Sequence, residues 1–456
     1  MVTITSPPRP PHAPAATPAP TAPVARPARA RASELVQRDV EPRRWSRSNS
    51  PGWYRVWAVL TAATLAVLCA VGSAAAIRSA GATSRIQSDT APALLGSQDL
   101  FGSVSEANAA ATAVVLSGAI GTEDRSRRSL YVQALNRASA QTEELSTLVG
   151  EDTESRGALK QIAVALTTYS GHMEASRREN ALRGTQAEAE LRTALDLASR
   201  DMAGAVDTVT DRSQTRFGEQ RQQGRIITIV AAACAAVALA ALIRLQAGTL
   251  ARSNRIVNLP MAAATVLVAI ELIMLGYAGV VRTTALGRAE TDGYRAIQAT
   301  ALLQRSAFEL QSQLSLDLLS GQTENSGTKR LQLTGRVNSN LAALSAIADT
   351  ERERAAITEL GIRWDRYQKA TAPLVAGKGA ATPATISEFQ SSGLSAFNGF
   401  NTTIESVLLD NRSQFTSGVD DAARATRWLP WLAVIAPLVG IVGVLLGAQR
   451  RLGDYK

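Results

Sequence analysis

The chain is poor in the side chains that catalysis and metal binding use most. It holds two histidines and two cysteines, and aromatic residues make up only 4% of its 456 positions. A catalytic triad, a zinc site or a histidine relay needs more than His12 and His172 supply. Cys69 and Cys234 fall inside apolar runs, where small packing residues are expected, and no CxxC motif is present. There is no phosphate-binding glycine loop either, so the composition argues against an enzyme, a cofactor and a metal site.

Alanine, leucine, valine and arginine are the abundant residues. Hydrophobic residues make up 46% of the chain, and only five of the 48 basic residues are lysine. Few aromatics and abundant alanine favour closely packed helices over an aromatic core. The net charge of +9 raises the question of nucleic acid. The basic residues gather beside apolar runs, however, where membrane topology and anionic lipid explain them better.

Four apolar runs organise the chain. They cover 53–77, 226–243, 258–281 and 428–448. A helix needs about 20 residues to cross a bilayer core of about 30 Å, so each run is long enough, or nearly so, to span a membrane. The small residues at 73–76 resemble a signal-peptidase site, but the apolar stretch is long and its counterpart at 258–281 is internal. An uncleaved anchor is therefore the favoured interpretation.

Charge in the short segments sets the predicted orientation. Segment 1–52 is rich in proline, alanine and arginine, which is typical of a disordered tail. This tail, the link 244–257 and the stub 449–456 carry more basic than acidic residues, so they are predicted to be cytoplasmic. Segments 78–225 and 282–427 then lie outside the cytoplasm. We expect a multi-pass protein of the plasma membrane with both termini in the cytoplasm.

The same order of elements occurs twice, about 200 residues apart. Each half has an apolar run, a long polar helical segment and a second apolar run. Four local matches recur in the same order, which favours an internal duplication. The matches are Arg78 with Arg282 (offset 204), Leu116-Ser117-Gly118 with Leu319-Ser320-Gly321 (203), Leu159, Ile162, Leu166 and Tyr169 with Ile357, Leu360, Trp364 and Tyr367 (198), and Arg212-Ser213-Gln214 with Arg412-Ser413-Gln414 (200).

Each polar segment is expected to fold as a four-helix bundle. Apolar residues recur at spacings of three and four, the seam of a helix that packs on helices, and turn residues separate four such stretches. The prediction is an all-α membrane protein with four transmembrane helices and two tandem extracytoplasmic four-helix bundles. Narrow, alanine-rich bundles leave little room for a buried ligand. Breaks are expected at Gly118–Asp124, Gly150–Asp152, near Gly184, at Gly321–Gly327, Asp349–Thr350 and Gly377–Pro383.

Glu271 is the acidic residue of the apolar runs, and its position demands a reason. It lies about 11 residues from Pro260, hence roughly 16 Å into the bilayer core. A carboxylate there costs at least about 2.5–3.5 kcal/mol, so we expect it to be protonated or hydrogen-bonded to a neighbouring helix. Two interpretations stay open: a polar latch that signalling shifts, or a helix-association contact without a switching role. Candidate donors are Thr61, Thr64 and Thr228.

Two prolines, Pro430 and Pro437, lie in the fourth apolar run. Proline removes a helix hydrogen bond, so Pro437 is expected to leave one carbonyl unpaired inside the membrane and to bend the helix. Proline is common in membrane helices, and the bend by itself does not indicate a signalling role.

These features together resemble known bacterial membrane sensors. Each half is similar to the periplasmic four-helix-bundle sensor of bacterial chemoreceptors. The whole chain resembles the actinobacterial GlnX-type signalling proteins in its Pro-rich tail, tandem helix–bundle–helix units, short inner link and charged stub. The resemblance implies that a GlnH-type solute-binding lipoprotein outside the cytoplasm senses Asp, Glu or Gln and docks on the bundles. It also implies a cytoplasmic PknG-like Ser/Thr kinase that controls glutamate and 2-oxoglutarate metabolism, and it carries no site residue over.

The small cytoplasmic parts support a relay on independent grounds. The link of about 14 residues and the eight-residue stub cannot hold an output domain, so a signal has to pass to a separate protein. Two other classes stay open: a structural scaffold that organises cell-wall or division proteins, and a chemoreceptor-like sensor that binds its ligand directly. A transporter is disfavoured because the repeats are parallel, whereas many transporters contain inverted repeats. Membrane lipids and further copies of the chain remain candidate partners.

Overall fold

The computed structural model describes residues 50–121, 124–181, 186–253, 259–320, 324–375 and 381–453. The chain divides into two units, Met1–Trp53 and Tyr54–Lys456. Nearly all of the first unit lies outside the described residues, and so do His12 and most of the predicted tail. In the second unit the described residues form helices and no strand, which confirms the predicted all-α fold.

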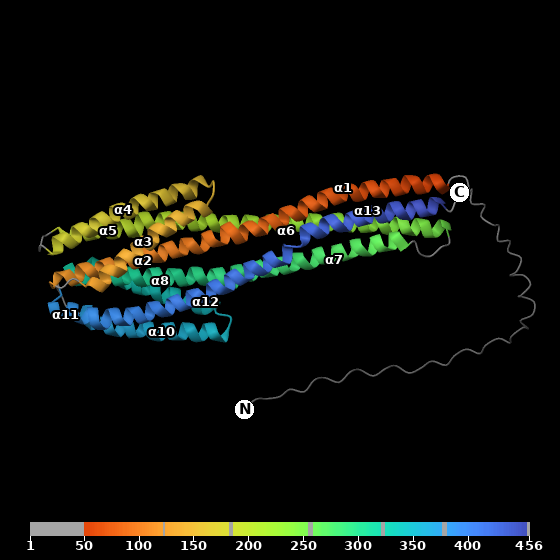
Figure 1. The fold of residues 1–456 in the computed structure, drawn as a ribbon. Coiled ribbons are helices and arrows are strands. Elements are labelled where there is room, and N and C mark those ends of the chain that lie inside the picture. Colours follow the sequence, from red (N-terminus) through yellow and green to blue (C-terminus); the bar gives the residue numbers. More distant parts are fainter. Residues whose placement is uncertain are drawn as a thin grey trace, which may run out of the picture. The chain divides into compact units, whose positions relative to one another are not determined.

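The first half of the second unit contains one bundle and two apolar helices (Figure 1). Its first rod runs without a break through α1 (Ser50–Arg85), the π-helical segment η1 (Ile86–Thr90) and α2 (Ala91–Ala119). Two shorter helices follow, α3 (Arg125–Leu148) and α4 (Thr153–Ala181). The last rod consists of α5 (Ala187–Asp196), the π-helical segment η2 (Leu197–Met202) and α6 (Ala203–Ser253). We call α2, α3, α4 and the rod from α5 into α6 bundle 1.

The second half repeats this order. Its first rod is α7 (Leu259–Arg288), the π-helical segment η3 (Ala289–Tyr294) and α8 (Arg295–Ser320). The middle helices are α9 (Glu324–Ile347) and α10 (Glu351–Thr371), followed by a 3₁₀ turn, η4 (Pro373–Val375). The last rod is α11 (Pro383–Glu388), the π-helical segment η5 (Phe389–Gly393) and α12 (Leu394–Thr426); a turn at Arg427 and Trp428 separates it from α13 (Leu429–Gly453). We call α8, α9, α10 and the rod from α11 to α12 bundle 2.

Local chemistry explains where the shorter helices begin. The Asp124 carboxylate accepts hydrogen bonds from the backbone N–H groups of Ser126 and Arg127 and so caps α3. Burial alone raises the pKa of a carboxyl, but these hydrogen bonds outweigh burial and lower the pKa of Asp124. Thr350 and Glu353 form a reciprocal capping box at the start of α10. Gly150, with φ of 60°, makes the left-handed turn between α3 and α4.

The four apolar segments pack together as a second structural layer. They are the first part of α1, the last part of α6, α7 and α13, and each lies in a helix long and apolar enough to cross a membrane. Inward-facing residues such as Leu65, Leu242 and Val268 are fully or almost fully buried, whereas Ile229 and Ile273 are 61% and 68% exposed. An exposed apolar belt around a packed centre is typical of helices that face lipid. The chain is therefore an all-α membrane protein.

Helix continues into the predicted cytoplasmic link 244–257. α6 continues as helix to Ser253, ten residues beyond the apolar run that ends at residue 243, and α7 begins at Leu259. Residues 244–253 carry arginine and no proline or acidic residue, so nothing stops the helix where the apolar run stops. Residues 254–257 of the link lie outside the described residues.

The two bundles pack side by side along α2 and α8. Figure 1 shows the two helices next to each other, with α3 and α4 on one side and α10 and α12 on the other. Residues of α2 such as Leu94 and Leu116 join the core of bundle 2, and Leu316 of α8 joins the core of bundle 1. Each bundle therefore contributes residues to the core of the other.

Burial gives the register between the halves. Buried positions of α1 and α2 fall on buried positions of α7 and α8 at an offset of 203, as in Leu94 and Ile297. Buried positions of α6 fall on those of α12 and α13 at an offset of 198, as in Phe217 and Phe415. All eight residues of the stripe predicted at an offset of 198 are buried.

Two of the four sequence matches do not fit this register. Arg78 is exposed whereas Arg282 is 2% exposed, and Ser213 is 2% exposed whereas Ser413 is exposed. These pairs lie on different faces of their helices, because an offset error of one or two residues turns a helix by about 100° or 200°. The Arg78/Arg282 and Arg-Ser-Gln matches therefore do not mark equivalent positions.

Bundle 2 has the aromatic core that the composition argued against. Phe308, Trp364, Tyr367, Phe397 and Phe400 are buried and form tilted and edge-on ring contacts with centroids 5.3–5.7 Å apart. Such pairs are favourable beyond the area they bury. The prediction was wrong for this half because a composition averaged over the chain hides the concentration of aromatics in one bundle.

Candidate functional site

Side chains that join helices of the second unit through polar contacts gather at three levels. One level surrounds Glu271 among the apolar helices, and we call it the membrane site. The junction network, which contains Ser79, Thr83, Gln220, Thr228 and Arg282, lies where these helices enter the bundles. The interbundle seam contains Phe101, Asn108, Asp207, Arg305, Glu309 and Ser312, at the contact of α2 and α6 with α8.

Glu271 lies on α7 in the middle of the four apolar helices and is 6% exposed. It borders a void of only about 10 Å³ that residues of α1, α6, α7 and α13 enclose. Such a void holds at most about one water molecule. Among the described residues Glu271 has no hydrogen bond and no ion pair. The structure thus places a carboxyl group where all four membrane helices meet.

The predicted donors to Glu271 have other partners or none. Thr64 Oγ1 donates to Leu60 O at 2.8 Å, and Thr228 Oγ1 donates to Gly224 O at 2.7 Å. Thr61 is buried at 4% exposure and has no hydrogen bond to the described residues. Cys69 and Cys234 are free thiols that line the void beside Glu271, in keeping with their predicted role as small packing residues.

The carbonyl of α13 that Pro437 leaves without its helix hydrogen bond has a partner on another helix. Pro437 cannot donate a backbone hydrogen bond to Ala433 O, four residues earlier. Ser73 Oγ of α1 donates to Ala433 O at 2.8 Å instead. Pro437 lines the same void as Glu271. A cross-helix hydrogen bond therefore compensates the proline next to the buried carboxyl.

The junction network holds a buried guanidinium. Arg282 of α7 is 2% exposed, and its Nε donates to Thr83 Oγ1 of α1 at 2.8 Å. Its Nη2 donates to Gln220 O of α6 at 3.4 Å. The absence of a side chain at Gly224 makes the space for the guanidinium, because a Cβ at that position would overlap it. One arginine thus ties three membrane helices together at the base of the bundles.

Neighbouring polar groups extend the junction network. Ser79 Oγ and Thr228 Oγ1 lie 3.0 Å apart and link α1 to α6. Thr90 Oγ1 donates to Gln220 Oε1 at 2.9 Å. Arg221 forms an ion pair with Glu290 of η3. Each of these contacts joins a helix of one half to α6, so the junction is cross-braced at the level where the helices leave the apolar layer.

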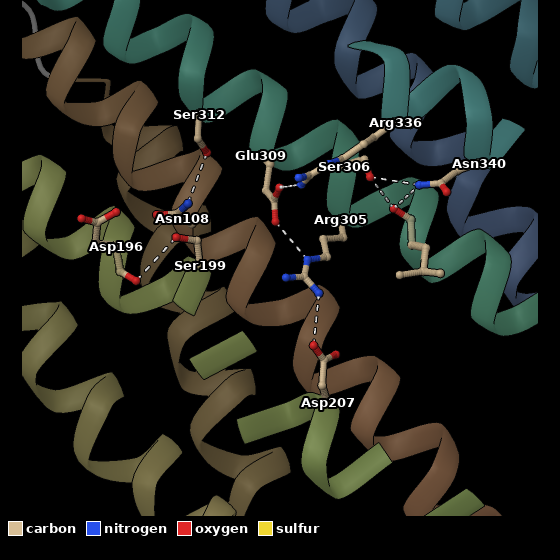
Figure 2. Close-up of polar contacts among 11 residues, drawn as sticks. Asn108, Asp196, Ser199, Asp207, Arg305, Ser306, Glu309, Ser312, Arg336 and Asn340 are labelled. Carbon is tan, nitrogen blue, oxygen red and sulfur yellow. Dashed lines mark hydrogen bonds and ion pairs between the residues drawn. The ribbon is translucent and has the colours of Figure 1, made fainter. Parts of the chain in front are cut away.

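Arg305 is the centre of the interbundle seam (Figure 2). Its Nε donates to Glu309 Oε1 at 2.9 Å, and its Nη1 lies 3.6 Å from Asp207 Oδ2 of bundle 1. The guanidinium carbon stands 4.6 Å from the centroid of the Phe101 ring, within the range of a cation–π contact. Arg305 of bundle 2 therefore contacts two elements of bundle 1 at once.

A buried amide completes the seam. Asn108 Nδ2 of α2 donates to Ser312 Oγ of α8 at 3.4 Å, and Tyr169 OH donates to Asn108 Oδ1 at 3.2 Å. Asp99 of α2 forms an ion pair with Arg412 of α12. Figure 2 shows Asn108 and Ser312 facing each other across the two helices. Both bundles are thus joined by directional contacts as well as by apolar packing.

Metal-binding clusters are not a feature of the described residues. No group of three His, Cys, Asp or Glu side chains that could hold a metal ion occurs among them. His172 Nδ1 lies 2.6 Å from Glu190 Oε2 on the neighbouring α5, which is a helix-to-helix contact within bundle 1. The polar contacts at the three levels join helices to one another.

Sequence reasoning found Glu271 and Pro437 but missed the seam and the junction. Arg282 was predicted only as a residue at a helix exit, and Arg305 stood in an ordinary amphipathic helix. A weak signal existed for Arg282, because Gly224 is the small residue that lets a guanidinium enter. No local pattern identifies Arg305, since its partners come from helices about 100 and 200 residues away.

Comparison with known proteins gives one result. Residues 82–222 match the family model described as an actinobacterial sensor domain. The match begins in α1 beside Thr83 and covers bundle 1 and the first part of α6. No curated protein matches the chain, and no solved structure matches it. The match indicates a sensing or signalling role for this part of a multi-pass membrane protein.

Proposed function

We propose that the protein relays a signal from the extracytoplasmic side of the membrane to a separate cytoplasmic protein. One observation carries the proposal: the rods α1–η1–α2 and α7–η3–α8 run unbroken from the apolar layer into bundles that share a core. A small displacement of one bundle against the other then moves membrane helices directly. Sensor-domain similarity over residues 82–222 supports a sensing role.

The proposed topology follows the arginine distribution. Segments 1–52, 244–257 and 449–456 lie in the cytoplasm, and 78–225 and 282–427 lie outside it, joined by membrane helices at 53–77, 226–243, 258–281 and 428–448. The two halves arose by duplication, and the burial registers of 203 and 198 residues support this. Parallel copies put both bundles on the same side of the membrane.

The proposed partners are proteins rather than small substrates. A solute-binding lipoprotein that senses Asp, Glu or Gln docks on the bundles, and a PknG-like Ser/Thr kinase receives the signal and adjusts glutamate and 2-oxoglutarate metabolism. The GlnX-type resemblance supports these identities. The internal link 244–257 is too short to hold an output domain, which supports an output through another protein.

Co-purification in mild detergent tests the relay. The chain, isolated from its own cells, is expected to capture a solute-binding lipoprotein and a cytoplasmic kinase, with the amount of kinase changing when Asp, Glu or Gln is added. Capture of neither protein sinks the proposal. A shape or division defect on deletion, unaffected by amino-acid supply, would instead favour the scaffold, and saturable binding of the amino acid to the isolated chain would favour the direct sensor.

A proline in the first rod tests the path of the signal. Ser88 is an exposed residue of η1, and Ser88→Pro breaks a helix at a cost of about 3 kcal/mol. The variant should still capture both partners but lose the amino-acid dependence, while Ser88→Ala keeps it. If the dependence survives in Ser88→Pro, the α1–α2 rod does not carry the signal.

Glu271 is proposed as a polar latch at the point where the membrane helices meet. Its equivalent at an offset of 203 is Leu68, so only the second half carries an acid here. Glu271→Gln should retain partial function, whereas Glu271→Leu and Glu271→Ala should fix one signalling state. The readout is kinase capture with and without amino acid; unchanged assembly and unchanged signalling in all three variants end the latch hypothesis.

A further inference from the structure

Bundle 2 contains a cavity that neither the relay nor the sequence patterns predict. Its volume is about 180 Å³, and it lies between the end of α9, the start of α10 and the middle of α12. Leu344, Ile357 and Val407 form its apolar wall, and each is less than 10% exposed. The cavity is on the side of bundle 2 that faces the membrane helices, near the turn between α9 and α10.

Asn411 of α12 borders this cavity with an unpartnered amide. Its side chain is 2% exposed, and it forms no hydrogen bond with the residues that the structure describes. Leaving a buried amide without a partner costs free energy, so nearly all such groups in proteins are paired. An amide offers a donor and an acceptor together. The Asn411 amide therefore offers the cavity a free hydrogen-bond donor and acceptor.

Bundle 1 shows how the same space is closed. At the offset of 198, Gln414 corresponds to Arg216, and Ile347 corresponds to Val149. Arg216 Nη1 donates to Val149 O at 2.8 Å, and Arg216 Nη2 lies 3.3 Å from Asp152. The long arginine side chain thus covers the turn between α3 and α4. Gln414 is shorter, and its Nε2 donates to Glu353 Oε1 at 2.9 Å instead.

The charged groups at the cavity mouth already have partners. Arg352 Nη2 donates to both carboxylate oxygens of Asp410, at 2.9 and 3.1 Å. Bundle 1 has the same bridge with the charges exchanged, Arg212 with Glu154, at the same offset of 198, so this bridge is part of the bundle and not a ligand contact. Glu353 is held by the capping box and by Gln414. A charged ligand would find no free counter-charge here.

We propose that this cavity binds a small uncharged molecule with an aliphatic body and a head that both donates and accepts a hydrogen bond, such as a carboxamide. The body lies on the wall of Leu344, Ile357 and Val407, and the head pairs with the Asn411 amide. Cavities of about 150 Å³ hold benzene, so this one suits roughly seven or eight non-hydrogen atoms. The inference goes beyond the relay and does not depend on the lipoprotein or the kinase.

Three aliphatic probes with one carbon skeleton test the chemistry. Isovaleramide, isovalerate and isoamylammonium are titrated against the full chain in lipid nanodiscs, with binding followed by calorimetry. The amide should bind saturably and at least about tenfold more tightly than either ion, because an unpaired buried charge is costly. Equal or tighter binding of an ion overturns the proposed head group. Binding of none of the three overturns the site, and a water molecule then satisfies Asn411.

Matched variants locate the binding. Asn411→Ala should weaken isovaleramide binding at least about tenfold, whereas Ser213→Ala, at the equivalent position of bundle 1, should leave it unchanged. Gln414→Arg places the covering arginine of bundle 1 over the cavity and should abolish binding. Thermal unfolding confirms that each variant folds. Isovaleramide affinity that survives both Asn411→Ala and Gln414→Arg shows that the probe binds elsewhere and overturns the proposal.

Discussion

Bundle 1 and bundle 2 have the same helices in the same order, but they fill and brace their interiors differently. Bundle 1 packs mostly small and aliphatic residues around a Tyr131–Tyr169 ring pair, and its buried Asn108 amide accepts a hydrogen bond from Tyr169 OH. Bundle 2 packs aromatic rings and leaves Gln311 Oε1 and Tyr367 OH without partners among the described residues, as bundle 1 leaves Tyr131 OH and Gln141 Oε1. The equivalent residues Tyr169 and Tyr367 thus differ, because the Tyr169 hydroxyl has a partner and the Tyr367 hydroxyl has none among the described residues.

The junction network also differs between the two halves. Ser79 of α1 and Arg282 of α7 are equivalent at an offset of 203. The serine hydroxyl needs one neighbour, whereas the guanidinium requires contacts from α1 and α6 and a glycine to make room. Equivalent backbone positions in the two halves thus carry side chains of different chemistry, which make different contacts.

Truncation of an aromatic ring should have the largest effect. Phe400 is fully buried in bundle 2, and Phe400→Ala should cost about 3–5 kcal/mol. The exposed Leu409 of the same helix serves as control, and Leu409→Ala should change stability by less than about 0.5 kcal/mol. Hydrogen exchange resolved by segment is the measurement. If α3 and α4 lose as much protection as α9 and α10, the two bundles unfold as one unit and the distinction between their cores is only local.

A methyl group at the junction should have the next largest effect. Gly224→Ala displaces the Arg282 guanidinium from Thr83 and Gln220, and breaking the contacts of a buried charge costs about 3 kcal/mol. Gly218→Ala, on the same helix with nothing near its Cβ position, should stabilise by up to about 1 kcal/mol. The free energy of unfolding in detergent is compared for both variants. Equal effects would mean that Arg282 adapts and does not brace the junction.

Removal of the equivalent hydroxyls of Tyr169 and Tyr367 should change the free energy of unfolding differently in the two bundles. Tyr169→Phe deletes the hydrogen bond to Asn108 and should cost about 1 kcal/mol. Tyr367→Phe deletes a buried hydroxyl that has no partner, so it should be neutral or stabilising. Burial raises the pKa of both phenols above their ordinary value, so neither ionises in the test. A cost for Tyr367→Phe as large as that for Tyr169→Phe would reveal an ordered water in bundle 2.

The smallest expected effect concerns pH and Glu353. Burial by itself raises the pKa of this carboxyl, but hydrogen bonds from Gln414 and from the N–H groups of Thr350 and Asp349 outweigh it and lower the pKa. A lowered pKa in the folded state adds stability above the unfolded-state value of about 4.3 and loses it as pH falls through the folded pKa. Glu353→Gln should therefore cost less than about 1 kcal/mol at pH 7.

The cost of Glu353→Gln should fall towards zero below about pH 4. Thermal unfolding from pH 3 to pH 7 measures it. Glu351→Gln, in the same first turn, corrects for the loss of one charge near the start of α10. A difference between Glu353→Gln and wild type that grows as pH falls contradicts the assignment of the capping box.

The sequence predicted the parts that depend on local pattern. Apolar runs predicted the four membrane helices, and turn residues predicted the breaks near Gly150 and Thr350. The stripe from Leu159 to Tyr169 and its counterpart from Ile357 to Tyr367 are both buried, as predicted. Register was less predictable, because the short matches at Arg78 and Arg212 are set by residue identity and not by the face of the helix. Helix length beyond residue 243 was missed for a related reason: the end of apolarity does not end a helix.

The candidate site was harder to predict because its contacts are long-range. Glu271 and Pro437 stand out by chemistry alone, but the partner of the Pro437 gap, Ser73, lies 360 residues from the carbonyl that it binds. The seam around Arg305 requires the packing of α2 against α8, and the cavity at Asn411 appears only when Gln414 is compared with Arg216. Each of these depends on which helices become neighbours, and one sequence does not contain that information in a local form.

The buried arginine of α7 has a consequence for biogenesis. Its partners Thr83, Gln220 and Gly224 all precede it in the chain, and synthesis proceeds from the N-terminus. When α7 leaves the ribosome, the receptor for its guanidinium has already been made. Ser73 likewise precedes Ala433, whose carbonyl Pro437 leaves open. Vectorial insertion thus lets each of these two polar groups meet a finished partner, so neither has to wait unpaired in lipid.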